Sequence, residues 1–157
     1  MWFKRLMGAF PHAARGILRA VRTERNLRVH LTAVVYVTWA GVLAGLDHIQ
    51  WAILCLCFGL VTALELVNTA VERLGDRVTR EWDPMIGGAK DAAAGAVLLA
   101  AAASVGVAVF LFGPWIASGG LLELIRNSPL FDGVFLLSLI PAVAWIAWDP
   151  KEEKKTK

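Results

Sequence analysis

Charged side chains are scarce in this chain of 157 residues. Asp, Glu, Lys and Arg together make up 18% of the sequence, whereas hydrophobic residues make up 57% and the mean hydropathy is +0.59. A soluble domain of this size would not need so much apolar sequence, so the composition indicates an integral membrane protein. We expect the lipid bilayer, and no nucleic acid, among its partners.

The chain also lacks several motifs that would define a function directly. Its two cysteines, Cys55 and Cys57, lie on roughly opposite faces of an apolar run, so we expect small buried side chains rather than a disulfide or a metal pair. No cleavable signal peptide is predicted, because the first long apolar run begins only after roughly thirty residues. The motif GxxxxGK[ST] and the protein-kinase glycine loop are both absent, which excludes two standard nucleotide folds.

Four apolar runs divide the sequence, at residues 29–46, 51–78, 91–116 and 130–148. The first three reach the length of about 17–25 residues that a crossing needs, and the fourth is interrupted by Asp132 and Pro141. The link at 47–50 is too short for anything but a hairpin between antiparallel helices. The fold class that we predict is an all-α integral membrane protein with an N-terminal amphipathic surface helix (1–28), a core of three transmembrane helices (29–116) and a C-terminal extension (117–157) that contains a fourth transmembrane helix (130–148).

The N-terminal segment has a basic and an apolar face at helical spacing. Arg15, Arg19 and Arg22 share one face, and the opposite face is apolar. This pattern is typical of a helix that lies on an anionic membrane surface. Glu24 falls on the apolar face, where it either pairs with Arg28 or points inward to other polar groups.

A polar stripe follows the second half of the second apolar run. Steps of three and four residues place four side chains on one face of a helix: Glu65, Asn68, Glu72 and Asp76. Glu65 follows Trp51 by only fourteen residues, which at about 1.5 Å per residue is too short for a full crossing. One interpretation makes Glu72 and Asp76 a solvated helix end. The other is a functional cluster at headgroup depth, because carboxylates inside a membrane are costly and usually functional.

Lys and Arg are distributed unevenly along the chain. All of them except Arg126 lie in residues 1–28, 73–90 and 149–157. The positive-inside rule therefore predicts a cytoplasmic N-terminus, middle segment and C-terminus, which an even number of crossings satisfies. The polar stripe then emerges on the side of the membrane where ATP and Mg²⁺ are found.

The cytoplasmic carboxylates suit a magnesium-dependent reaction. They are hard oxygen donors of the kind that Mg²⁺ prefers: Glu24, Glu72, Asp76, Glu81, Asp83 and Asp91. Lys90, at the start of a predicted helix, is placed to bind phosphate. With a carboxylate at the interface, these groups indicate phosphoryl transfer to a lipid hydroxyl. A small cation or proton transporter and a structural scaffold are the alternatives, and the scaffold leaves Glu65 unexplained.

Three motifs resemble those of the prokaryotic diacylglycerol kinase and undecaprenol kinase family: ELVNTAVE at 65–72, AKDAAAGAVL at 89–98 and ERNLRVH at 24–30. The resemblance covers roughly residues 5–115. It implies a small homotrimeric enzyme of the bacterial inner membrane, with a cytoplasmic N-terminus and active sites formed between neighbouring subunits. It also implies ATP as the phosphate donor, Mg²⁺ as the cofactor and a membrane lipid alcohol as the substrate.

The resemblance further implies individual roles. Glu65 would be the catalytic base that takes the proton from the lipid hydroxyl, with Asn68 in the same site and Arg5 as a further lipid contact. Glu24 and Glu72 would bind Mg²⁺. The ATP contacts would be His12, Glu24, Glu72, Asp76, Glu81, Trp82, Asp83, Lys90 and Asp91, of which Lys90 would bind the phosphates.

Two lipid alcohols are candidate acceptors, undecaprenol and diacylglycerol. Residues 24–30 and the pair Asn68-Thr69 look like the undecaprenol kinase branch of the family. We also expect Arg25, Arg28 and His30 to crowd the rim where a glycerol ester headgroup would need room. Undecaprenol is therefore the predicted acceptor, and diacylglycerol is the alternative.

Overall fold

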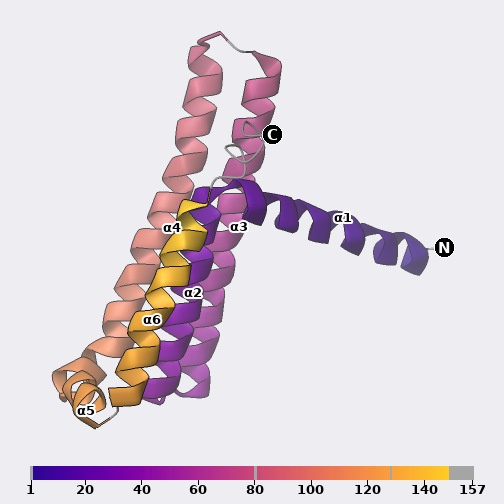
Figure 1. Cartoon of the computed structure of the whole chain (residues 1–157). Coiled ribbons are helices and arrows are strands. Elements are labelled where there is room, and N and C mark those ends of the chain that lie inside the picture. The colour runs from indigo at the N-terminus through magenta and orange to yellow at the C-terminus, as the bar shows by residue number, and fades with distance from the viewer. Residues whose placement is uncertain (1, 80, 128, 149–157) are drawn as a thin grey trace, which may run out of the picture.

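The computed structural model describes residues 2–79, 81–127 and 129–148, and their side chains except those of 2–7, 125, 127 and 129–132 (Figure 1). Within these ranges the chain forms helices and no strands. The helices are α1 (Trp2–Thr23), α2 (Arg25–Ala44), α3 (His48–Val78), α4 (Pro84–Ala117), α5 (Gly120–Asn127) and α6 (Pro129–Ala147). The predicted all-α membrane class is confirmed.

Three of the described helices, α2, α3 and α4, are long and apolar enough to cross a membrane. α3 has 31 residues and α4 has 34. At 1.5 Å per residue they are about 46–51 Å long, well beyond the hydrocarbon core of roughly 30 Å. Both extend past α1 at one end of the molecule (Figure 1), so the α3–α4 tip reaches into water on the side where α1 lies.

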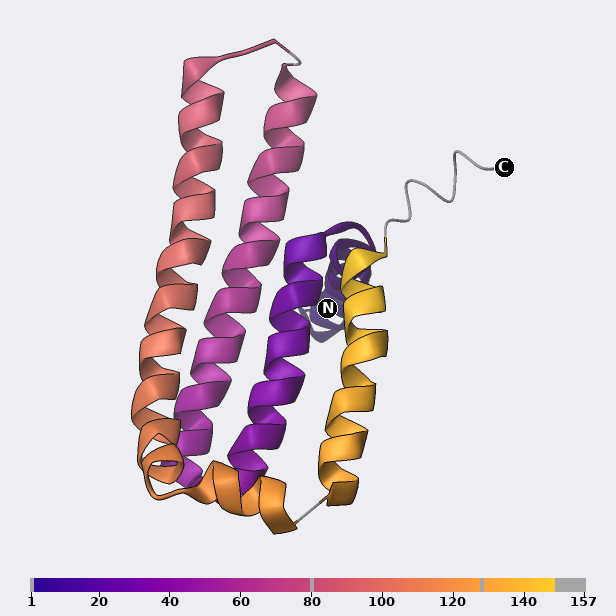
Figure 2. The same cartoon turned by 60° about the vertical axis from the view of Figure 1, so that its left-hand side comes forward.

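α6 is a shorter apolar helix that runs antiparallel beside α2 (Figure 2). Tyr36 and Ser138 share a hydrogen bond of 3.0 Å between their hydroxyl oxygens. The Phe135 ring packs against Tyr36 and Trp39, with centroids 5.5 and 5.4 Å away. The helix expected at 130–148 is therefore present, and its crossing of the membrane stays a prediction.

The turn between α2 and α3 is built from local sequence signals. Gly45 ends α2 in the left-handed conformation, at φ 67°, which glycine adopts without a steric cost. Asp47 caps α3 by accepting hydrogen bonds from the backbone N–H groups of Ile49 and Gln50. The Gln50 side chain accepts from the Asp47 N–H in return, which completes a capping box. The predicted hairpin is confirmed.

The chain breaks between α1 and α2 at Glu24. This residue has an extended backbone, with φ −104° and ψ 114°, and α1 projects away from the other helices (Figure 1). The surface helix that we expected to continue to residue 28 ends at Thr23, and residues 25–28 belong to α2. Helical spacing continues across a one-residue break, so the sequence pattern alone could not show it.

The polar segment 73–90 is mostly helical. α3 continues to Val78, and α4 begins at Pro84 after Asp83. The Asp83 carboxylate accepts hydrogen bonds from the N–H groups of Met85 and Ile86, and proline at the first helical position needs no hydrogen-bond acceptor. Only residues 79–83 link the two helices, so the polar ends of α3 and α4 face each other.

Candidate active site

Glu65 is a buried carboxylate on α3, with 3% of its surface exposed. It has a side-chain hydrogen bond with Asn26, and His30, Glu72 and Glu24 lie close enough to act on it electrostatically. The start of α2 and the middle of α3 therefore bring Glu24 and Glu72 within electrostatic range of Glu65. We call Glu24, Glu65 and Glu72 the carboxylate cluster.

Asn68 lies between Glu65 and Glu72 on the same face of α3. Its Nδ2 atom donates a hydrogen bond of 3.1 Å to Glu72 Oε1. Its Oδ1 atom is buried and has no hydrogen-bond partner within the described part of the chain. Buried polar atoms normally have a partner, so this oxygen is available to a ligand or a water molecule in the cluster.

Glu24 is held by Arg73, a residue that the sequence analysis did not single out. Arg73 Nη2 donates to Glu24 Oε1 over 2.7 Å, and the Thr23 hydroxyl donates to the same oxygen over 2.9 Å. The expected alternative of a pair with Arg28 is wrong. Arg73 directly follows Glu72, which is a sequence signal that could have identified it. Asn26 lies two residues after Glu24, inside the motif at 24–30.

A second polar group lies at the α3–α4 tip. Lys90 Nζ and Asp76 Oδ1 form an ion pair of 2.5 Å. A half-open pocket of about 730 Å³ is lined by Asp76, Thr79, Glu81, Trp82, Asp83, Ile86, Gly87 and Lys90. We call it the tip pocket. It collects five of the residues that the sequence analysis proposed for ATP.

Gly75 permits this close approach of the two helices. A Cβ atom at Gly75 would lie 2.7 Å from Lys90 Cε and 2.9 Å from Ile86 Cγ2. Real side chains do not approach so closely, so any larger residue would force the end of Lys90 and the Ile86 side chain to shift. The glycine is therefore part of what places Lys90.

The remaining predicted site residues lie apart from both groups in this chain. His12 is exposed on the projecting part of α1, where Arg15 Nη2 donates to its Nδ1 over 2.9 Å. Asp91 is exposed beside Lys90 and does not line the tip pocket. The side chain of Arg5 lies outside the described residues. Glu65 and Asp76 are eleven residues apart on α3, about 16 Å along the helix.

The carboxylate cluster has a donor set that fits Mg²⁺. No group of three His, Cys, Asp or Glu side chains with metal-binding geometry occurs among the described residues. Mg²⁺, however, usually binds one or two carboxylates and completes its shell with water and substrate phosphates. Glu24 and Glu72 are two such carboxylates, and Asn68, which is hydrogen-bonded to Glu72, has an oxygen without a partner among the described residues. These residues could hold Mg²⁺ together with ATP phosphates.

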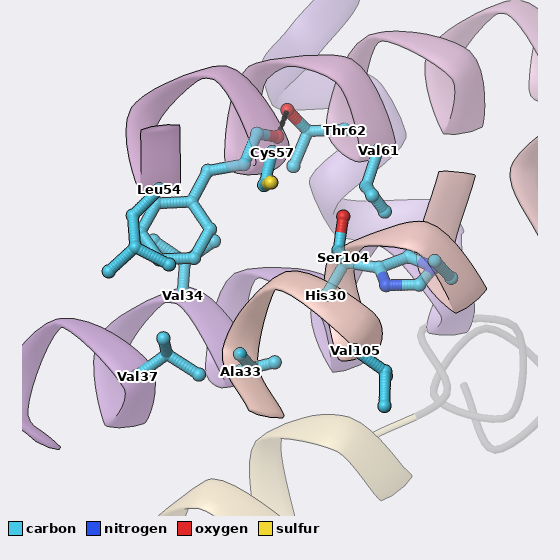
Figure 3. Close-up of a pocket in the computed structure, with 13 residues that line it drawn as sticks. His30, Ala33, Val34, Val37, Leu54, Cys57, Val61, Thr62, Ser104 and Val105 are labelled. Carbon is cyan, nitrogen blue, oxygen red and sulfur yellow. Dashed lines mark hydrogen bonds between the residues drawn. The ribbon is translucent and has the colours of Figure 1, made fainter. Parts of the chain in front are cut away.

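An apolar cavity of about 310 Å³ lies between α2, α3 and α4, below the carboxylate cluster. His30 and Ser104 lie at one end, and Leu54 and Val34 lie toward the other (Figure 3). Val61, which lines the cavity, lies about one helical turn before Glu65 on the same face of α3. The cavity therefore leads away from the catalytic candidate into the apolar part of the helix bundle.

Long apolar helices, a buried carboxylate beside an apolar pocket and further carboxylates nearby are features that an integral membrane phosphotransferase for lipid alcohols would need. The profile of the prokaryotic diacylglycerol kinase family matches residues 11–112, and the chain belongs to this family. The family match favours the kinase interpretation over the transporter and scaffold alternatives. α6 lies beyond the matched residues.

Relatives with assigned activities agree with this placement. The chain is 43% identical over 109 residues to an undecaprenol kinase of Bacillus subtilis, covering 68% of this chain and 89% of that protein. It is 44% identical over 101 residues to a diacylglycerol kinase of Synechocystis, covering 64% of this chain and 58% of that protein. A diacylglycerol kinase of Escherichia coli is 32% identical over 102 residues, or 62% and 80% of the two chains. No solved structure matches.

Proposed function

We propose that this protein transfers the γ-phosphate of ATP to the hydroxyl of undecaprenol. The observation that carries the proposal is the position of Glu65, which is buried beside two further carboxylates and directly above an apolar cavity. A lipid hydroxyl at Glu65 would have its hydrocarbon chain in the cavity. The similarity to the Bacillus subtilis undecaprenol kinase, which extends over most of that protein, supports the same acceptor.

Glu65 acts as the general base in this proposal. Its carboxylate accepts the proton of the lipid hydroxyl as the oxygen attacks the γ-phosphorus in line with the departing ADP. Asn26 and Asn68 orient the carboxylate and the groups around it. Glu24 and Glu72 hold Mg²⁺, which supplies charge neutralisation on the phosphates.

The tip pocket would bind the rest of the nucleotide. Lys90 is the phosphate contact, and it would exchange its bond with Asp76 for one with phosphate. Glu81, Trp82 and Asp83 line the pocket on the side of the link, and an aromatic ring there offers a surface for stacking. His12 and Asp91 would contact ATP from α1 and α4 once subunits assemble.

Assembly as a homotrimer is supported by the exposed face of α3. Seven apolar residues on this face alternate in steps of three and four: Ile53, Leu56, Leu60, Ala63, Val67, Ala70 and Leu74. All seven are exposed in the single chain, and Leu56 is exposed by 74%. This spacing is the heptad pattern of helices that pack against one another. Self-association through α3 would bring α1 and the α3–α4 tip of one subunit toward the carboxylate cluster of the next.

The orientation follows from the charges. α1, the end of α6 and the α3–α4 tip all lie at the same end of the molecule (Figures 1 and 2). The basic segments 1–28 and 73–90 belong to this end, which the positive-inside rule places in the cytoplasm. The site would therefore lie at the cytoplasmic surface of the bacterial inner membrane, where it is open to ATP.

The choice of undecaprenol over diacylglycerol is supported by the similarity to the Bacillus subtilis enzyme, and the residues at the rim of the pocket of about 310 Å³ bear on it as well. Arg25 is exposed and His30 lines the cavity. Arg28 is buried and turned toward the ends of α1 and α6, so it does not crowd the rim as the sequence analysis expected.

A direct comparison of acceptors tests the proposal. The purified protein is assayed in one detergent with undecaprenol and with diacylglycerol at matched mole fractions. We expect a higher kcat/KM for undecaprenol by about 5- to 150-fold, because apolar contacts discriminate by about 1–3 kcal/mol. Equal or faster phosphorylation of diacylglycerol would reverse the choice of acceptor.

A further inference from the structure

One arginine, Arg28, donates hydrogen bonds to backbone carbonyl groups at the ends of two helices, α1 and α6. Arg28 is 2% exposed. Its Nη1 atom donates to the Val21 and Arg22 carbonyls at the end of α1, over 3.3 and 3.1 Å. Its Nη2 atom donates to the Ile146 and Trp148 carbonyls at the end of α6, over 3.4 and 2.6 Å. Last-turn carbonyls have no partner within their own helix, and the helix dipole favours a cation beside them.

Trp148 contributes its ring to the same contact. The Arg28 guanidinium carbon lies 5.9 Å from the ring centroid, a distance at which an aromatic face attracts a cation. The described part of the chain has two ion pairs, Arg73–Glu24 and Lys90–Asp76, and Arg28 belongs to neither of them. α6 therefore supplies two of the four carbonyls and the aromatic face that together hold this buried charge. Because an unpaired buried charge is costly, loss of the α6 contacts would release Arg28.

Arg28 connects α6 to the carboxylate cluster through a short piece of backbone. Its acceptors Val21 and Arg22 precede Glu24 by three and two residues. Glu24 forms the extended turn between α1 and α2, and its own side chain does not cap α2. Holding the last turn of α1 therefore fixes the direction from which the chain enters the turn at Glu24.

We propose that α6 positions Glu24 for Mg·ATP, with Trp148 holding Arg28 and Arg28 holding the end of α1. The proposal rests on the proposed function, because it needs Glu24 to bind Mg·ATP. α6 lies beyond residues 11–112, the part that matches the family, so this device belongs to the C-terminal extension. Arg28 and Trp148 are positioning residues, since they act on the site through the backbone at Glu24.

The test compares two tryptophans of the full-length protein. Trp148→Ala removes the ring from Arg28. Trp145→Ala is the matched control, because Trp145 is one turn earlier and has a similar exposure, 37% against 43%. We expect Trp148→Ala to weaken Mg·ATP binding by at least about fivefold, measured both as the Kd of the purified protein at equilibrium and as the KM, with kcat and the KM for undecaprenol changed less. Trp145→Ala should keep the wild-type KM for Mg·ATP.

Four further variants make the outcome specific. Trp148→Phe keeps an aromatic face and should restore most of the affinity for Mg·ATP. Arg28→Gln should raise the KM for Mg·ATP at least as much as Trp148→Ala, because it removes the four carbonyl hydrogen bonds as well as the ring contact. Adding Trp148→Ala to Arg28→Gln should have little further effect, because the ring then has no guanidinium to contact. Glu24→Gln should raise the same KM and so confirms independently that this residue serves Mg·ATP.

Two results would overturn the positioning role. One is an unchanged KM for Mg·ATP in Trp148→Ala, and the other is an equal increase in Trp148→Ala and Trp145→Ala. If either occurs while Glu24→Gln still raises this KM, only the role of α6 fails. If Glu24→Gln leaves the KM unchanged, the metal assignment in the proposed function fails as well.

Discussion

Glu72 of the carboxylate cluster and Asn68 form a hydrogen-bonded pair on α3. Asn68 uses its amide nitrogen to hold Glu72 Oε1, and its own Oδ1 has no partner among the described residues. Glu72 is exposed, whereas Glu65, two turns earlier, is buried. This difference suits a metal ligand that ATP reaches from water and a base that the lipid reaches from the membrane.

Replacing Glu72 should therefore impair metal binding. We expect Glu72→Gln to raise the Mg²⁺ concentration for half-maximal activity by at least about tenfold, and EDTA should abolish the activity of the wild type. The measurement is the initial rate as Mg²⁺ is titrated at fixed ATP. Glu123→Gln, an exposed change on α5, is the control and should leave the curve unchanged. A wild-type Mg²⁺ dependence in Glu72→Gln would remove this residue from the metal site.

Helix periodicity was enough to predict the stripe, because residues four apart on a helix must share a face. The bond between Asn68 and Glu72 follows directly from that rule. The ion pair between Glu24 and Arg73 could not be predicted in the same way. These residues are 49 positions apart, and their meeting depends on the break at Glu24 and on the packing of α1 against α3.

At the scale of elements, the α3–α4 tip shows why apolar runs do not mark helix ends. The lipid-exposed part of a helix must be apolar, but its continuation into water can be polar and still helical. Thus Asp83 and Pro84 determine where α4 starts, seven residues before the apolar run at 91. The sequence predicted the number and order of the long helices and the end of α3 at residue 78, but it placed the starts of α2 and α4 four and seven residues too late.

Gly75 provides a test of this tip. Gly75→Ala should shift the end of Lys90 from its place in the tip pocket, because the new Cβ would lie 2.7 Å from Lys90 Cε. We expect the KM for ATP to rise by roughly three- to tenfold, which corresponds to the free energy of one hydrogen bond. The helix content measured by circular dichroism should not change. Gly88→Ala on the facing helix is the control, since nothing lies within 4 Å of its Cβ. An unchanged KM in Gly75→Ala would show that Lys90 need not lie there.

At the scale of the whole molecule, one chain does not gather all of the proposed site residues. The tip pocket lies where α3 and α4 meet, and Glu65 precedes Asp76 by eleven residues on α3. His12 belongs to α1, the helix that projects away in Figure 1. The apolar heptad face of α3 is exposed along its length. Both features are accounted for if neighbouring subunits complete each other's sites. A sequence without its partners could indicate this only through the family resemblance.

Mixed trimers test the sharing of sites. Glu65→Gln and Lys90→Ala chains are each expected to be inactive. If Glu65 and Lys90 of a site come from different subunits, an equal mixture should regain about a quarter of the wild-type activity. Each of the two subunits has an even chance of carrying the intact residue that the site needs from it. Subunits are exchanged in detergent, and cross-linking verifies the trimers. Sites contained within single chains would give no recovery in verified mixed trimers.

The most direct test of the central claim is the transfer of labelled phosphate from ATP to lipid by wild-type and Glu65→Gln protein. Both proteins are placed in vesicles that contain undecaprenol, and the lipid extracts are separated by thin-layer chromatography. We expect labelled undecaprenyl phosphate with the wild type, and about 10²- to 10⁴-fold less with Glu65→Gln, the usual cost of losing a general base, although Mg·ATP binding is retained. Near-normal labelling by Glu65→Gln, or no labelled lipid with the wild type, would contradict the assignment of this cluster as a lipid kinase site.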